Sequence, residues 1–403
     1  MQPSPTRSLQ DVRLSGFSER AALAVAFAWL DQLSIVPAFE DVVIAEATGR
    51  VLAEPVGSRF DLPDIDRAAT DGYAVRAADC DGASAYNPLS LTWIEQAAGR
   101  LPPGAASLVA AGWAVPDNAD AVLSFDAAQH VGQTLDVLAP VAPGTGIDRR
   151  GREIRAGATL LERGRRLRPQ DLGWLAALGI ASVPVIARPR AYLLVPGPKH
   201  GPDAVSPLLR ALLERDGAVV RDVQADAGES GLASALDSLA AGDGAMVILA
   251  GRSGTGPDDV AAPAIRAAGG TLALHGLAMQ PGGSAGLGML GTQPVVLLPG
   301  EPFACMVAYD MLASRLVRRM GGLDAGLPYA VAILELERKI ASGIGLAEIV
   351  PVRCCAGRAR PVGIESGLTG PVRADGFVVV AETSEGYAAG TQVRVHLYDE
   401  PAV

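Results

Sequence analysis

The feature that most constrains the fold is a regular alternation of apolar and amphipathic stretches between residues 188 and 322. Apolar runs such as "AYLLV", "AMVILAG" and "QPVVLLPG" alternate with stretches of helical periodicity such as "SPLLRALLERDG" and "ESGLASALDSLAAGDG". Strands that are apolar along their whole length must be covered on both faces, so this pattern predicts a parallel sheet between two layers of helices. The segment "EPFACMVAYDMLASRLVRRMGG" is expected to close this α/β domain as one helix.

The remainder of the 403-residue chain is too long to share that single core. Residues 18–33 have helical spacing, with Ser18 in the position of an N-cap. Short apolar runs such as "LSLTWI" and "DAVLSF", separated by turn clusters such as "LPPG", predict an inserted β domain. The expected organisation is an N-terminal and linking region of residues 1–50 and 141–187, a β insertion of residues 51–140, the α/β domain of residues 188–322, and a C-terminal β domain of residues 326–403.

Charge and composition argue against several classes of function. The net charge of −10 is unfavourable for a general nucleic-acid-binding surface. No apolar run approaches the roughly 20 residues that span a bilayer, and the N-terminal stretch lacks the apolar centre of a secretion signal. The four cysteines and four histidines are not spaced as zinc ligands. A cytoplasmic protein without a membrane partner is therefore expected.

Four loops rich in glycine or proline are predicted at the carboxyl ends of the strands, where ligands of such sheets bind. They read "VPGPKHGPD", "AGRSGTGPDD", "AMQPGGSAG" and "LPGEP". Backbone amides freed by glycine, followed by a helix N-terminus, can cradle phosphate or another oxyanion. None of the loops has the pattern of a nucleotide P-loop or of a dinucleotide fingerprint. Asp258 and Asp259 either bind a hard cation such as Mg²⁺ or begin the next helix.

Two further stretches each allow two interpretations. In "DLPDIDRAATDGYAV", Asp71 stands between small residues and a Gly-Tyr pair. Because Asp-Gly is common in turns, Asp71 is either a turn residue or an acid presented to a ligand. The arginine-rich "RRGREIR", residues 149–155, is either a solvated loop or a contact for an anion or a partner.

From residue 18 onward the chain resembles the molybdopterin molybdenumtransferase family, which includes the E domain of gephyrin. The similar stretches are, in order, "EATGRVLAEPVGSRFDLPDIDRAATDGYAVRAAD", "GREIRAGATLLERGRRLRPQDLGWLAALGI", "GRSGTGPDD", "QPGG", "LPGEP" and "ADGFVVVAE". The resemblance implies an elongated linking region interrupted by a β insertion, an α/β domain that holds molybdopterin, and a C-terminal β domain. It also implies a homodimer whose site combines loops from both subunits, with partners among molybdoenzymes or biosynthesis proteins.

The reaction that the resemblance implies joins molybdate to adenylylated molybdopterin with Mg²⁺ and releases AMP. Molybdate is a tetrahedral dianion, so its pocket needs amides and cations, and a metal would neutralise the phosphates as their bond breaks. Asp71 and Asp259 are the expected catalytic acids, and Asp258 joins them as a candidate metal ligand. The residues expected to hold the pterin are Lys199, Gly251, Arg252, Ser253, Gly254, Gly256, Pro281, Gly282, Pro299 and Gly300.

Several positions depart from the family's pattern. Ala111 stands where Thr is usual, Ala245 for Asp, Arg252 for Gly, Gln280 for Lys, Ser284 for Pro, and Glu301 for Asn. Three functions therefore stay open. The first is an enzyme in which Lys199 and Arg252 restore the positive charge lost at Gln280. The second is a divergent homologue that binds molybdopterin or a partner without efficient insertion, and the third is a scaffolding protein.

Overall fold

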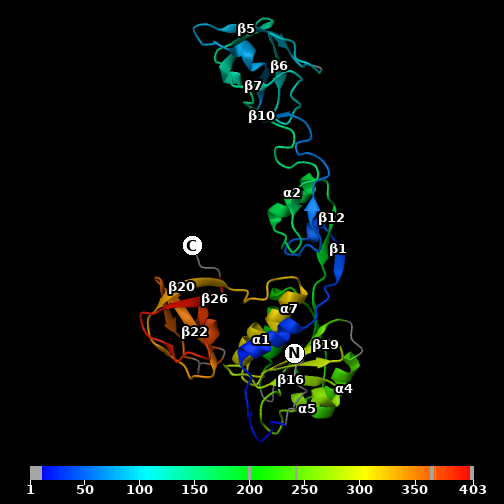
Figure 1. Ribbon diagram of the computed structural model, residues 1–403, viewed down its shortest axis with the longest axis vertical. Coiled ribbons are helices and arrows are strands. Elements are labelled where there is room, and N and C mark those ends of the chain that lie inside the picture. Colours follow the sequence, from blue (N-terminus) through cyan, green and yellow to red (C-terminus); the bar gives the residue numbers. More distant parts are fainter. Residues whose placement is uncertain are drawn as a thin grey trace, which may run out of the picture. The chain divides into compact units, whose positions relative to one another are not determined.

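The structure is a computed structural model that describes residues 11–97, 99–197, 201–240, 244–363, 367 and 369–399 (Figure 1). The chain divides into two compact units. One unit comprises residues 41–185, and the other comprises the residues before 41 together with those after 185. Within the described ranges, no helix combines the length and the apolar character needed to cross a bilayer.

The α/β domain is built on a six-stranded sheet with the order β14-β13-β15-β19-β18-β16. The first four strands are parallel to one another, β18 is antiparallel to β19, and the edge strand β16 is antiparallel to β18. The predicted parallel sheet is confirmed for these four strands, and the whole sheet is mixed because a two-residue turn at Gly291 and Thr292 joins β18 to β19 as a hairpin. The strands are β13 (Arg190–Leu194), β14 (Val219–Asp222), β15 (Met246–Ala250), β16 (Thr271–His275), β18 (Gly286–Leu290) and β19 (Gln293–Leu298).

Helices cover both faces of this sheet, as the apolar strands predict. Alternate residues of β15 face opposite layers, with Ile248 in one cluster and Val247 and Leu249 in the other. Figure 1 shows α4 and α5 on one side of the sheet and α1 and α7 on the other. The helices are α1 (Leu23–Gln32), α3 (Val205–Arg215), α4 (Glu229–Leu239), α5 (Ala261–Ala267), α6 (Pro302–Ala308) and α7 (Ser314–Met320).

Two predicted helices differ in the structure. The closing helix is interrupted by a π-helical turn over Tyr309–Ala313 between α6 and α7. In this turn the buried carboxylate of Asp310 accepts hydrogen bonds from Arg215 at 2.9 Å and from the hydroxyl of Tyr329 at 2.8 Å. The N-terminal helix begins at Leu23 rather than near Ser18, because the preceding residues lie against the α/β domain, where Ala21 forms a β-bridge with Leu277.

The unit of residues 41–185 contains the inserted β domain, a six-stranded sheet with the order β7-β4-β6-β5-β9-β8. The predicted run "LSLTWI" is strand β5 (Leu89–Ile94). The other strands of the sheet are β4 (Gly72–Val75), β6 (Ala105–Val109), β7 (Ala121–Leu123), β8 (Ala128–Val131) and β9 (Thr134–Val137). Shorter pairs and one helix precede and follow it: β1 (Phe39–Val43) with β12 (Ser182–Ile186), β2 (Val56–Gly57) with β11 (Thr159–Leu161), β3 (Arg67–Ala68) with β10 (Ile147–Asp148), and α2 (Pro169–Ala177).

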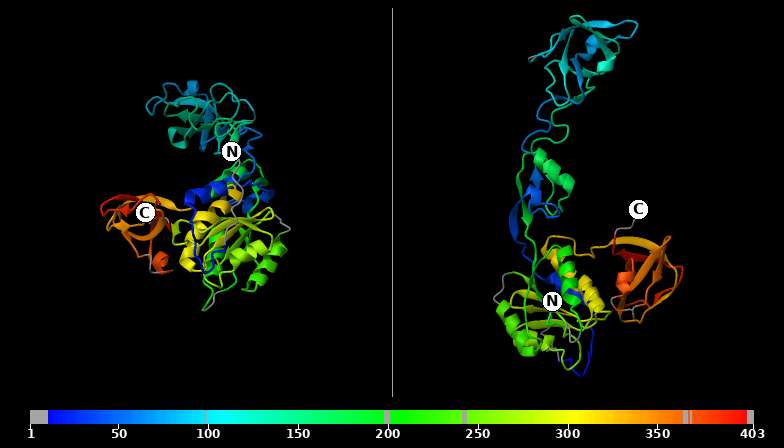
Figure 2. Two further views of the ribbon diagram at one scale, coloured as in Figure 1. Left: turned by 60° about the horizontal axis from the view of Figure 1, so that its bottom comes forward. Right: turned by 180° about the vertical axis from the view of Figure 1, so that it is seen from behind.

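The C-terminal β domain is a closed barrel. Strand β24 pairs with both β26 and β22, which completes the ring β22-β23-β20-β26-β24. Figure 2 shows these orange and red strands from two further directions. The elements are β20 (Ala330–Leu336), β21 (Ile340–Ala341), β22 (Ala347–Cys355), β23 (Arg358–Pro361), α8 (Thr369–Arg373), β24 (Gly376–Val380), β25 (Gly386–Tyr387) and β26 (Gln392–Leu397), with β17 (Met279–Gln280) of the α/β domain pairing to β22.

Candidate functional site

Three of the predicted glycine loops meet at Gly251, directly after β15. A Cβ at Gly251 would lie 3.9 Å from the Cα of Gly300 and 4.0 Å from the Cγ of Pro196, which follow β19 and β13 respectively. The amide of Gly251 also donates to the carbonyl of Leu298 at 2.9 Å. Because β14 and β15 lie on opposite sides of β13, the strand order reverses beside these loops, where α/β sheets bind ligands.

Ser253 ties the fourth loop to the other three. Its buried hydroxyl is 3.0 Å from the hydroxyl of Ser284, in the loop between β17 and β18. The carbonyl of Ser253 lies 2.9 Å from Nε2 of His275, which donates if this nitrogen carries the proton. Burial lowers the pKa of His275 below its ordinary value, so the ring is held in its neutral form. The glycine loop is thus braced from both neighbours.

Arg252 adopts a left-handed backbone conformation with φ of 57°. Such a conformation is strained for an arginine and favours the glycine that the family pattern has at this position. The carbonyl of Arg252 accepts from the amide of Ala261 at 3.0 Å, which fixes the turn into α5. Within the described part of the chain its guanidinium forms no ion pair, so its charge is left for a ligand or for solvent.

The side chain of Asp259 is hydrogen bonded to the backbone of the glycine loop that precedes it. Its Oδ2 accepts from the amide of Gly256 at 2.7 Å, and a Cβ at Gly254 would lie 2.7 Å from the same oxygen. Asp258 beside it is exposed. No three histidine, cysteine or acidic side chains gather as a metal site among the residues that the structure describes. Two adjacent carboxylates suit a Mg²⁺ ion that arrives with phosphate oxygens, since Mg²⁺ commonly takes only one or two protein ligands.

In the loop between β17 and β18 and in the loop between β19 and α6, neighbouring atoms leave little free space or occupy the backbone amides. At Gly282, which has φ of 107°, a Cβ would lie 2.6 Å from Cε of Met279 and 3.2 Å from the carbonyl of Ala304. Pro281 precedes it with a cis peptide bond. Glu301, which follows Pro299 and Gly300, caps α6 by accepting from the amides of Phe303 at 3.1 Å and Ala304 at 2.6 Å. Ala245 is buried just before β15, and Lys199 lies outside the described residues.

Asp71 belongs to the other unit, at the start of β4, where its side chain is exposed. Its Oδ1 accepts from the amide of Ala111 at 2.8 Å, so the acid links the residue before β4 to the segment that follows β6. The following Gly72 is explained by packing. A Cβ there would lie 2.9 Å from Cγ1 of Val122 and would collide with the carbonyl of Leu123. The strand therefore requires glycine next to the acid.

The arginine-rich loop forms ion pairs with acids of the stretch "DLPDIDR", residues 61–67. Arg149 contacts Asp66 at 2.7 Å, and Arg150 contacts Asp61 at 2.6 Å. The pKa of Asp61 is lowered, first by the amide of Ala156 and then by Arg150. Both arginines are exposed, as expected for a solvated loop, and their ion pairs also hold the chain around "DLPDIDR" in place. A contact with an anion or a partner stays a prediction.

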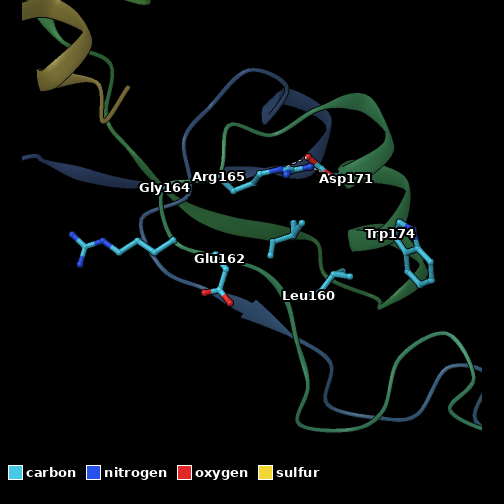
Figure 3. A pocket seen from close by; sticks show the side chains of 8 residues that line it. Leu160, Glu162, Gly164, Arg165, Asp171 and Trp174 are labelled. Atoms are coloured by element: carbon cyan, nitrogen blue, oxygen red, sulfur yellow. Dashed lines mark hydrogen bonds and ion pairs between the residues drawn. The ribbon is translucent and has the colours of Figure 1, made fainter. Parts of the chain in front are cut away.

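A cavity of about 500 Å³ also lies in the unit of residues 41–185 (Figure 3). Figure 3 shows the guanidinium of Arg165 reaching the carboxylate of Asp171, 3.0 Å apart, with Trp174 on another side. The same carboxylate caps α2 through the amide of Arg168 at 2.9 Å. The carboxylate that lines this cavity is thus already hydrogen bonded, to Arg165 and to the backbone at the start of α2. The lining residues are Leu160, Leu161, Glu162, Arg163, Gly164, Arg165, Asp171 and Trp174, none of them a predicted site residue.

Two residues at the loops were not anticipated from the sequence. His275 is the one titratable residue of strand β16, a pattern that could have drawn attention to it. Arg20 donates to the carbonyl of Gly283 at 2.9 Å from a segment far away along the chain. No local pattern could have indicated that contact.

Comparison with known proteins agrees along nearly the whole chain. Three family models match: the MoeA N-terminal region (domains I and II) at residues 20–179, a "probable molybdopterin binding domain" at 185–319, and the MoeA C-terminal region (domain IV) at 334–398. Molybdopterin molybdenumtransferase 2 of Mycobacterium tuberculosis is 30% identical over 381 residues, covering 88% of this chain and 94% of the relative.

Two more comparisons extend this result. A molybdopterin molybdenumtransferase of Staphylococcus aureus is 25% identical over 327 residues, covering 76% of this chain and 77% of the relative. A crystal structure of the molybdopterin biosynthesis MoeA protein of Pyrococcus horikoshii is 29% identical, with a TM-score of 0.80 over 95% of this chain and 100% of that one. The chain therefore belongs to the MoeA family of molybdenum cofactor biosynthesis proteins.

Proposed function

We propose that the chain binds adenylylated molybdopterin at the carboxyl edge of its α/β sheet and inserts molybdate into it, releasing AMP. Membership of the MoeA family and the relatives named molybdopterin molybdenumtransferase support this reaction. The observation that carries the proposal is the convergence of the loops after β13, β15 and β19 at Gly251. A backbone without side chains at this point lets an anionic ligand approach the amides closely.

The charges of the loops support an anionic ligand that brings its own metal. Arg252 supplies a cation beside Gly251, and Asp258 and Asp259 would hold Mg²⁺ against the phosphates of the substrate. When bound, Mg²⁺ would neutralise charge as the phosphoanhydride breaks. Asp259 would orient the glycine loop through Gly256 at the same time.

A second candidate function is binding of molybdopterin without efficient insertion. The observation in its favour is Glu301, whose carboxylate uses the amides of Phe303 and Ala304 that could otherwise face a ligand anion. A negative charge at this loop opposes an incoming dianion, and oxyanion chemistry depends on positive charge and amides. Both candidate functions predict binding of the pterin ligand, and only the first predicts turnover with molybdate.

The deciding experiment measures molybdate-dependent AMP release from adenylylated molybdopterin, together with calorimetric binding of the same compound. Release well above the protein-free control supports insertion. Binding without release assigns the second function, and absence of both refutes the proposal in either form.

A variant tests the place of the ligand. Arg252→Gly removes the cation and relieves the left-handed strain, so binding should weaken while thermal stability is kept or raised. The control is Asn118→Gly, which also places glycine at a left-handed position, with φ of 78°, in the other unit and should leave binding unchanged. Equal affinity of Arg252→Gly and wild type would show that the ligand lies elsewhere.

We also propose that the protein is a homodimer in which Asp71 of one subunit serves the loops of the other. Closed twofold symmetry would provide two such shared sites. Mixing the Asp71→Asn and Asp259→Asn variants tests this arrangement, because a mixed dimer retains one intact site. Random reassortment should restore roughly a quarter of the wild-type rate. No recovery, or a monomer by sedimentation at micromolar concentration, would refute the shared site.

A further inference from the structure

The segment that precedes α1 contacts two of the site loops. The amide of Leu14 donates to the carbonyl of Thr255 at 2.8 Å, in the glycine loop after β15. Phe17 meets the edge of His275, with ring centroids 5.0 Å apart. His275 in turn contacts the carbonyl of Ser253. This segment thus packs against the loop after β15 and against the histidine that contacts Ser253.

Arg20 of this segment is bound to a site loop through its positively charged side chain. Its Nη1 donates to the carbonyls of Gly283 at 2.9 Å and Leu277 at 3.3 Å, and its guanidinium carbon lies 5.0 Å from the ring centroid of Phe17. Two carbonyls and one aromatic ring therefore hold the guanidinium at the loop between β17 and β18. The described part of the chain places no carboxylate in an ion pair with it.

The position of Arg20 depends on the absence of a side chain at residue 283. A Cβ built on Gly283 would collide with Nη1 of Arg20. The guanidinium therefore occupies the space in which a side chain of the loop would begin. Arg20 therefore brings a positive charge to the loop between β17 and β18, which has no basic residue of its own.

The loop that holds Arg20 is joined to the loop that carries Arg252. Ser284, next to Gly283, is hydrogen bonded to Ser253, next to Arg252. Two guanidinium groups without ion-pair partners among the described residues are thus attached to one braced pair of loops. Guanidinium groups match tetrahedral oxyanions because their N–H donors lie in a planar fork.

We propose that Arg20 is an anion-recognition residue of the candidate site, which binds a tetrahedral oxyanion through the N–H groups that it does not use on the loop carbonyls. The inference deepens the proposed function and rests on it. The oxyanion is either a phosphate of the adenylylated ligand or molybdate itself.

The test measures calorimetric binding of molybdate alone and of AMP alone to wild type, Arg20→Gln and Arg20→Lys. Arg20→Gln should weaken binding of at least one probe roughly tenfold to a hundredfold, the size of one or two charge-assisted hydrogen bonds. Arg20→Lys should fall between the two, since lysine keeps the charge without the fork. The matched control is Arg13→Gln, which removes the same charge from the same segment, where it pairs with Asp11.

The outcomes separate this inference from the proposed function. Loss confined to molybdate assigns Arg20 to the molybdate site, and loss confined to AMP assigns it to a phosphate. Wild-type binding that Arg20→Gln leaves unchanged overturns the inference alone. An equal loss in Arg13→Gln also overturns it, because the effect would then be one of general charge. Wild type that binds neither probe nor adenylylated molybdopterin refutes the proposed function as well.

Discussion

Replacing Asp71 by Asn distinguishes two roles of this residue, a structural role in the backbone turn and a catalytic role as an acid. Among the described residues, the carboxylate of Asp71 makes one hydrogen bond, as acceptor for the amide of Ala111 at 2.8 Å. An Asn oxygen can accept the same hydrogen bond, and a single hydrogen bond contributes about 0.5–1.5 kcal/mol net. Because the bond is kept, the free energy of unfolding should change by less than about 1 kcal/mol. The substitution therefore removes a charge with little change of shape.

If Asp71 acts in the transition state, its loss should lower turnover more than ligand binding. A fall of roughly a hundredfold corresponds to about 2.7 kcal/mol at 1.36 kcal/mol per decade. That cost exceeds the expected change in stability, so the two roles can be distinguished. The assay is molybdate-dependent AMP release, with the affinity for adenylylated molybdopterin measured on the same preparations.

The matched control for this experiment is Asp120→Asn. Asp120 lies in the same unit and also accepts from a backbone amide, that of Ala77, at 2.7 Å. Its replacement should leave turnover within about twofold of wild type, a difference of well under 1 kcal/mol. Turnover of Asp71→Asn equal to that of the control would refute the catalytic role and leave Asp71 as a turn residue.

Two more predictions concern stability. Arg215→Met leaves the buried carboxylate of Asp310 without its cation, so the free energy of unfolding in urea should fall by roughly 3–5 kcal/mol. Arg210→Met, which breaks a more exposed pair, should cost less than about 1 kcal/mol, and similar losses in both would contradict the reasoning. Burial lowers the pKa of His275 from its ordinary value of 6.5. When the pH falls below 6.5, the unfolded chain binds a proton at His275 more readily than the folded chain does, so the free energy of unfolding decreases as the pH drops through this range. His275→Gln should reduce that slope in thermal unfolding at pH 5 to 8, and an unchanged slope would mean that His275 does not contribute.

Local pattern was sufficient for much of the fold. Continuous apolarity in "AMVILAG" predicts a strand buried on both faces, and β15 is such a strand, because covering both faces of a sheet is required by burial alone. The run "LSLTWI", set between turn clusters, predicts strand β5, which is only partly buried. The glycine loops could be located because they follow apolar strands, and parallel strands in one sheet place their carboxyl ends at one edge.

Contacts between distant residues were decided only by the tertiary structure. The hairpin of β18 and β19 reverses the direction of β18 within the sheet, and the apolar pattern of a strand does not tell in which direction it will pair. Asp61 and Arg150 are separated by 89 residues, and Arg20 and Gly283 by 263. A side chain's own neighbours in the chain set its secondary structure, but its partner depends on which surfaces meet when the hydrophobic core forms. For that reason the sequence alone determined where the glycine loops are, and folding determined which charges reach them.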